Sequence, residues 1–211
     1  MMQIISHRGY WKSPGEKNAQ EAFDRSFSLG FGTETDFRDY NGRVVISHDI
    51  ANESSLSMEG FFEIYSQYNE DLPLAINIKA DGLQKLLKEA IARSQIRNYF
   101  VFDMSVPDTL GYIDFGIRFF SRQSEYEPQP AFYERCAGIW LDAFTDIWYD
   151  SDLVLGHIAK GKQVALVSPE LHKREPIKLW DFIKKTQLYE SEQLILCTDL
   201  PEDARHYFEI L

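Results

Sequence analysis

The chain has 211 residues, 44% of them hydrophobic, and no Pro- or Gly-rich linker divides it. We therefore expect one domain, residues 1–211, with a single core. Its 33 acidic residues outnumber its 22 basic ones, giving a formal charge of -11, which disfavours nucleic acid or an anionic membrane surface as a partner. No apolar stretch approaches the roughly 20 residues of a membrane-spanning helix, so no span is expected.

The cysteine content predicts the compartment. Cys136 and Cys197 are the two cysteines, and each adjoins an apolar run, so we expect buried thiols rather than a disulfide framework. The start, Met1 to Ser6, lacks a basic segment followed by a long apolar run, which would mark a secretory signal. We therefore expect a cytoplasmic protein. Its oligomeric state is not predicted.

Short apolar runs alternate with segments of helical periodicity along the whole chain, and no internal repeat is visible. This alternation is typical of a parallel sheet whose strands are joined by helices. The predicted strands are Gln3–Ser6, Gly32–Phe37, Val44–Ser47 after a turn at Asn41-Gly42, Leu74–Ile78, Tyr99–Asp103, Ile117–Ser121, Gly138–Leu141, Gln163–Val167 and Leu194–Cys197. Because Val44–Ser47 extends the second unit, eight strands remain.

Helical spacing of apolar residues marks most of the intervening segments. The predicted helices are Ala19–Leu29, Met58–Tyr68, Gly82–Ser94, Val106–Ile113, Ala131–Arg135, Asp152–Lys160, Pro176–Thr186 and Glu202–Ile210. The clearest apolar stripe, expected to pack on the strands, joins Leu83, Leu86, Leu87, Ala90 and Ile91. Eight strand–helix units indicate the α/β class and a (β/α)8 TIM barrel, with an open doubly wound sheet as the alternative.

Two carboxylates end the second predicted strand. Glu34 and Asp36 are two residues apart, so their side chains share one face of the strand. Like charges on one face repel each other unless a positive group lies between them. We interpret the pair as ligands of a divalent cation, which prefers oxygen donors. A salt bridge with Arg8 or Arg38 is the alternative.

Two histidines are the candidate proton-transfer groups. His7 ends the first strand and His48 ends the extension of the second, so a barrel places both at the rim that carries active sites. Such a pair can act as general base and general acid. Asp49 is assigned no role beyond orienting His48. The remaining histidines are expected to be surface or packing residues: His157, His172 and His206.

Further polar residues lie at the ends of other predicted strands. Arg8 can bind phosphate oxygens through its planar guanidinium, or else pair with a carboxylate. Gly9 lets the backbone come close to a ligand. Trp140 and Asp142 share a face, where a ring can stack on a sugar or glycerol and a carboxylate can bind hydroxyls. We therefore list these side chains as candidate substrate contacts.

Three separated motifs, His7-Arg8-Gly9, Glu34-Thr35-Asp36 and His48-Asp49, occur in the order of a known family. The chain resembles the glycerophosphodiester phosphodiesterases, within the barrel enzymes similar to phosphatidylinositol-specific phospholipase C. The resemblance is strong over residues 3–49 and persists weakly to Asp199-Leu200-Pro201. It implies the phosphodiesterase type of TIM barrel. The cofactor that we expect is a divalent cation, Mg²⁺ or Ca²⁺.

The resemblance extends to single positions. Asn18, Ala22 and Gly30 lie where the first helix of the family and its end fall. On the third strand, Asn77 and Lys79 share a face, and Lys79 matches the phosphate-contacting lysine of the family. The resemblance alone implies the places of Asn18, Ala22 and Gly30 and the phosphate-contacting role of Lys79.

Asn77 departs from the family, which usually has a glutamate there that is, by resemblance, the third metal ligand. An amide oxygen can coordinate a hard cation, but a dipole in place of a charge predicts weaker binding. Two interpretations stay open. Glu125, Asp103 or Asp142 replaces the missing carboxylate ligand, or the site has lost its catalytic activity.

The segment from Ile50 to Ala75 is the second departure, because the family commonly carries a longer insertion there that helps to cover the glycerol side of the substrate. We expect a missing or reduced cap. Glycerophosphodiesters are then the default substrate, and a phosphate-linked glycan or a lipid head group is also reasonable.

The sequence therefore predicts a metal-dependent phosphodiester hydrolase that acts on a small-molecule phosphodiester. His7 and His48 are its acid–base pair, and its predicted metal ligands are Glu34, Asp36 and Asn77. Two alternatives stay open: a non-catalytic phosphoryl-ligand binding protein on the same barrel, and a metal-independent lyase that releases a cyclic phosphate.

Overall fold

The computed structural model describes residues 1–68 and 71–210. The chain forms two compact units, one of residues 7–119 and the other of Met1–Ser6 together with the chain from Phe120 onward. The order of parallel strands and helices along the chain is that of the predicted (β/α)8 fold. Within the described residues, no helix is long and apolar enough to cross a bilayer.

The unit of residues 7–119 is built on three parallel strands in the order β5–β4–β2. Strand β2 is Gly32–Tyr40, β4 is Leu74–Ile78 and β5 is Tyr99–Phe102. Pairing of β2 with β4 sets Asp36 opposite Asn77. This register puts the polar residues of neighbouring strands side by side.

Strand β3, Arg43–Ile46, forms an antiparallel hairpin with β2. The two turn residues, Asn41 and Gly42, have φ values of 48° and 75°, as expected of an Asn-Gly hairpin turn. The predicted turn and strand extension are therefore confirmed.

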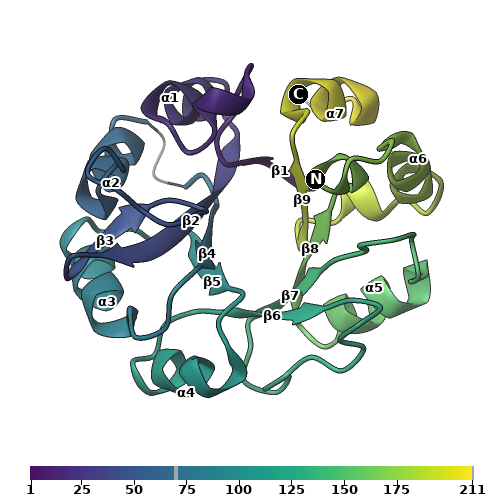
Figure 1. The fold of residues 1–211 in the computed structure, drawn as a ribbon. Helices are drawn as coiled ribbons and strands as arrows, with labels where there is room; N and C mark the ends of the chain where they lie inside the picture. Colours follow the sequence, from purple (N-terminus) through teal and green to yellow (C-terminus); the bar gives the residue numbers. More distant parts are fainter. Residues whose placement is uncertain (69–70, 211) are drawn as a thin grey trace. The chain divides into compact units, whose positions relative to one another are not determined.

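Four helices lie on one side of the strands of this unit (Figure 1). They are α1 (Gln20–Ser28), α2 (Met58–Ser66), α3 (Gln84–Arg93) and α4 (Val106–Asp114). Aromatic side chains join α1 to α2, with the ring centroids of Phe23 and Phe61 4.7 Å apart. Of the predicted apolar stripe in the third helical segment, Leu83, Leu87, Ala90 and Ile91 are buried, whereas Leu86 is 40% exposed.

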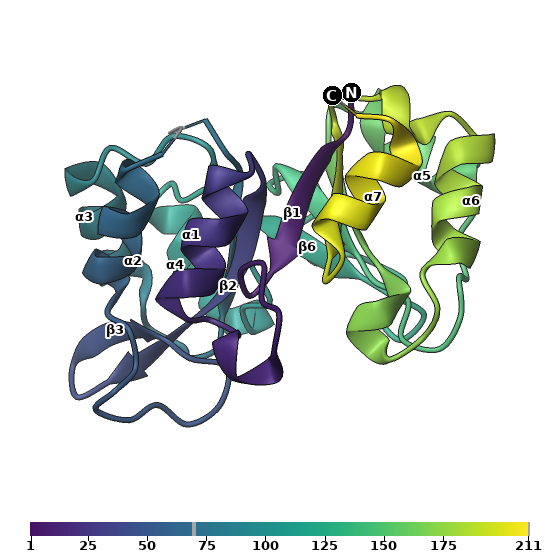
Figure 2. The same cartoon turned by 90° about the horizontal axis from the view of Figure 1, so that it is seen from above.

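The other unit is a parallel sheet in the order β1–β9–β8–β7–β6. Its strands are β1 (Gln3–His7), β6 (Phe120–Gln123), β7 (Gly138–Leu141), β8 (Gln163–Val167) and β9 (Leu194–Thr198). Its helices, α5 (Ser151–Ala159), α6 (Ile177–Lys185) and α7 (Pro201–Phe208), lie together on one face of these strands (Figure 2). Both cysteines are buried free thiols here, as predicted.

Residues 1–68 and 71–210 also contain three short 3-10 helices, which the sequence did not predict: Pro14–Glu16, Pro169–His172 and Leu188–Glu190.

Two sequence predictions in this region are wrong. The segment Ala131–Arg135 forms turns rather than a helix, because Phe132 has a φ of 52°, outside the helical range. Strand β6 begins at Phe120 instead of Ile117. Ile117 ends the preceding connection, where its N–H donates to the carbonyl of Tyr112.

Candidate active site

A sharp turn after β1 positions the first motif. Arg8 and Gly9 have φ values of 60° and 79°, and the N–H of Arg8 donates to the carbonyl of Glu34 at 2.9 Å. A Cβ atom on Gly9 would lie 2.7 Å from that of Ala22 in α1. The glycine therefore allows the turn to pack on α1. The close approach of its backbone to a ligand stays a prediction. The turn fixes Arg8 beside β2.

Asp36 is the centre of the polar network. Its carboxylate is fully buried and lies 2.9 Å from Nε of Arg8 and 3.4 Å from Nζ of Lys79. The side-chain amide of Asn18 donates to it at 2.8 Å. The salt bridge with Arg8, the alternative to metal binding in the sequence, is therefore present. It leaves Glu34 as the less neutralised carboxylate.

Glu34 is buried, with 1% of its surface exposed. Burial and the nearby charge of Asp36 raise its pKa to about 8, although Arg8, Lys79 and a hydrogen bond with Asn77 act in the opposite direction. The carboxyl is therefore protonated at neutral pH unless another cation approaches. A divalent ion would supply that charge.

Two buried oxygens support a cation at this position. Oδ1 of Asp36 and Oδ1 of Asn77 accept no hydrogen bond within the described structure, and the two residues are paired across β2 and β4. With Glu34 they form a set of oxygen donors that suits Mg²⁺ or Ca²⁺. No three His, Cys, Asp or Glu side chains in residues 1–68 and 71–210 gather as a metal site, so this set depends on the Asn77 amide.

Two of the three carboxylates considered as replacement metal ligands have other partners. Glu125 accepts the backbone N–H groups of Phe144 and Thr145. Asp142 lies 2.7 Å from Nε2 of His172.

The two candidate catalytic histidines differ in exposure. Nε2 of His7 lies 4.0 Å from Oε2 of Glu34, and 12% of its side chain is exposed. His48 is 43% exposed, and its Nδ1 lies 2.8 Å from Oδ1 of Asp49. The hydrogen bond with His48 lowers the pKa of Asp49. The Asp49 contact is the orienting one that we predicted.

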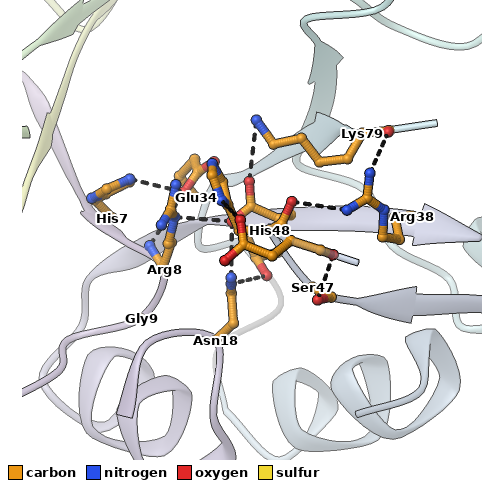
Figure 3. A network of polar contacts seen from close by, with 12 residues as sticks. His7, Arg8, Gly9, Asn18, Glu34, Arg38, Ser47, His48 and Lys79 are labelled. Atoms are coloured by element: carbon orange, nitrogen blue, oxygen red, sulfur yellow. Dashed lines mark hydrogen bonds and ion pairs between the residues drawn. The ribbon is translucent and has the colours of Figure 1, made fainter. Parts of the chain in front are cut away.

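Arg38, considered in the sequence only as a salt-bridge partner of the carboxylates, instead binds two backbone carbonyl groups at the site. Its Nη1 donates to the carbonyl of His48 at 3.1 Å and its Nη2 to the carbonyl of Lys79 at 3.2 Å (Figure 3). It therefore ties together two segments that carry candidate site residues. Its place on β2, two residues after Asp36, was the available signal, because alternate strand residues share a face.

Asn18 is a second residue whose contacts the sequence did not predict. It has a φ of 60°, donates to Asp36 and accepts a hydrogen bond from Oγ1 of Thr35 at 2.9 Å. These bonds fix the Asp36 carboxylate from the side of the loop before α1. The resemblance had marked the position without a role.

Trp140 and Asp142 belong to the unit that contains β7. Trp140 is 4% exposed, so most of its ring is packed. Asp142 accepts the N–H of Ala143 at 2.8 Å and holds His172, whose ring lies 4.8 Å from that of Phe144. The sequence missed this pair, because 30 residues separate its members. Substrate binding by Trp140 and Asp142 stays a prediction.

No protein-family model matches the sequence, and no curated protein sequence matches it. Solved structures do match in fold. A glycerophosphodiester phosphodiesterase from Agrobacterium tumefaciens has a TM-score of 0.72 at 13% identity, with 100% of both chains covered. An Oleispira antarctica phosphodiesterase in complex with the product sn-glycerol-3-phosphate has a TM-score of 0.67 at 16% identity, over 98% of this chain and 96% of that one.

A third solved structure with a similar fold is that of a phospholipase C. A Ca²⁺-dependent phosphatidylinositol-specific phospholipase C from Streptomyces antibioticus has a TM-score of 0.54 at 10% identity, over 97% of this chain and 95% of that one. The predicted fold, a (β/α)8 barrel, is confirmed.

Proposed function

We propose that the chain is a metal-dependent phosphodiesterase that hydrolyses a small phosphodiester. The observation that carries the proposal is the buried oxygen set of Glu34, Asp36 and Asn77, in which Oδ1 of Asp36 and Oδ1 of Asn77 accept no hydrogen bond from any described residue. Structural likeness to phosphodiesterases supports the same reaction class. The product in the Oleispira antarctica structure makes glycerophosphodiesters the first substrates to test.

Lewis-acid polarisation of a phosphoryl oxygen is the chemistry that a cation held by Glu34, Asp36 and Asn77 supplies. Arg8 and Lys79, both near Asp36, bind the non-bridging oxygens and offset their charge. Deprotonation of Glu34 accompanies metal binding, because the ligand form of a carboxyl group is the carboxylate.

His7 and His48 carry the proton transfers. One imidazole takes a proton from the attacking water while a new P–O bond forms, and the other protonates the alkoxide as its P–O bond breaks. The products are a phosphomonoester and an alcohol. Asp49 holds the His48 ring through Nδ1, and Arg38 fixes the backbone on which that ring is carried.

Product analysis tests this proposal. We expect ³¹P NMR to show phosphomonoester release from glycerophosphocholine or bis(p-nitrophenyl) phosphate with Mg²⁺ or Ca²⁺, and none with chelator. A cyclic phosphate formed in chelator would instead establish the lyase. Binding without any product would establish the phosphoryl-ligand binding protein. The two free cysteines support the reducing cytoplasm as the compartment of the reaction.

A further inference from the structure

A cleft of about 620 Å³ opens beside His48 and Arg8, within the unit of residues 7–119. Lys17 and Asn18 line it from the loop before α1, and Ser54 and Ser55 line it from the loop that follows His48. Its volume lies in the roughly 300–1,000 Å³ range of small-molecule sites. Because candidate catalytic and phosphate-binding groups form part of its wall, a moiety in the cleft can be attached to the phosphate.

Arg8, Asp49 and Lys17 all line the cleft, and Oδ1 of Asp49 already lies 2.8 Å from Nδ1 of His48. Lys17 adds an ammonium group to this lining. Its Nζ lies 4.3 Å from the centroid of the Trp11 ring, and no carboxylate in the described part of the chain pairs with it. An aromatic face already covered by an ammonium group cannot contribute to a cage for choline. The same ammonium group repels a second cation. The cleft is therefore a poor site for a quaternary ammonium head group.

Two serine hydroxyls in the lining of the cleft are fixed by a turn at Asn52. Oγ of Ser54 donates to Oδ1 of Asn52 at 2.7 Å and keeps lone pairs that can accept. Oγ of Ser55 accepts the N–H of Asn52 at 3.2 Å and keeps a proton to donate. A donor and an acceptor in the same cleft as a lysine match a ligand with several hydroxyl groups.

On the basis of the proposed function, we propose that this cleft binds the alcohol portion of the phosphodiester and selects a polyhydroxylated ring, a sugar or a cyclitol, over choline. The short loop from His48 to α2 leaves the cleft open, with Ile50 91% exposed. A ring alcohol fills more of the volume than the three-carbon glycerol does.

Binding measured in chelator, where no metal-dependent turnover occurs, tests the selection directly. The ligands are three glycerophosphodiesters that differ in one alcohol: glucose, inositol or choline. We expect calorimetry to give at least about tenfold tighter binding for one of the ring diesters, the scale of one hydrogen bond to a charged group. Tighter binding of the glucose diester indicates a substrate derived from a glycan, and tighter binding of the inositol diester indicates a lipid head group. Equal or tighter binding of the choline diester overturns the proposal.

Turnover of bis(p-nitrophenyl) phosphate with Mg²⁺ or Ca²⁺ is measured in parallel. Its absence counts against the proposed function and leaves the binding comparison to decide on the cleft. Turnover without ring preference in binding overturns the cleft proposal alone.

Lys17→Gln tests the residue assignment. Loss of the ammonium group should reduce the preference for the ring diester over the choline diester by about tenfold. Lys85→Gln, which changes an exposed lysine of α3 outside the cleft, should leave the preference unchanged. An unchanged preference in Lys17→Gln overturns the assignment of Lys17 as the selecting residue.

Discussion

Among the candidate site residues, the fold changes the protonation of Glu34, because burial and the charge of Asp36 raise the pKa of its carboxyl group to about 8. Its pKa in the unfolded chain is about 4.3, so the folded state holds the proton more tightly. The stabilising contribution of the protonated form is complete below the unfolded pKa and is lost as pH rises through the folded pKa.

We therefore expect the free energy of unfolding of the metal-free protein to fall between about pH 5 and pH 8, and Glu34→Gln to reduce that fall. Denaturant unfolding in chelator, at several pH values, measures both proteins. Parallel pH profiles would show that the fold does not raise the pKa of this carboxyl.

His7 and His48 are the residues that we expect to transfer protons during catalysis. His7→Ala and His48→Ala should each lower kcat by at least about a hundredfold, the usual contribution of a general acid or base. Circular dichroism should show an intact fold in both variants. His206→Ala, at the histidine of α7, is the matched control and should retain its turnover. Near-normal turnover in either site variant would refute that histidine's role.

Asn77 decides how strongly the oxygen set holds its cation. Asn77→Glu adds a buried charge, so we expect the dissociation constant for Ca²⁺ or Mg²⁺ to fall at least about tenfold. The same variant should unfold more easily in chelator, because three carboxylates then lie together without a cation. Calorimetry and unfolding curves measure the two effects. An unchanged dissociation constant would remove Asn77 from the ligand set.

Residue positions were predictable where a strand fixed them. The shared face of Glu34 and Asp36, and that of Asn77 and Lys79, follow from the two-residue period of a strand. The partners of Arg38 and Asn18 were not predictable, since they depend on how loops bring distant backbone groups together. Sequence spacing carries no such information for loops.

At the scale of elements, the turn between β1 and α1 depends on Gly9. Gly9→Ala should destabilise the fold by about 2 kcal/mol or more, because it combines left-handed strain with a clash against α1. Gly30 has the same φ of 79° and nothing within 4 Å of the added Cβ. Gly30→Ala should therefore show the strain alone, about 1–2 kcal/mol. Equal losses in denaturant unfolding would show that packing on Ala22 does not matter.

Most elements could be predicted because their signals are local. Apolar periodicity located the helices, and the Asn41-Gly42 pair located the β2–β3 hairpin. The segment Ala131–Arg135 failed because five residues carry too little periodicity to outweigh the left-handed φ of Phe132. The prediction that Leu86 is buried was wrong, because an apolar residue at the edge of a helical stripe need not be buried.

At the scale of the whole molecule, the fold is shared with phosphodiesterases at 13% and 16% identity. Fold is retained at such distances because it depends on the apolar pattern more than on particular side chains. Function depends on a few polar residues. In this chain those residues are Glu34, Asp36 and Asn77, which we propose to hold a cation needed for phosphodiester cleavage.

The most direct measurement is turnover of bis(p-nitrophenyl) phosphate as free Mg²⁺ or Ca²⁺ is titrated into chelator-treated protein, for the wild type and for Asp36→Asn. We expect saturable turnover in the wild type, and in the variant a loss of at least about tenfold in kcat or in affinity for the ion. Circular dichroism confirms that the variant is folded. Turnover at full rate in chelator, or the same metal dependence of turnover in the folded variant as in the wild type, would contradict metal-dependent cleavage at this site.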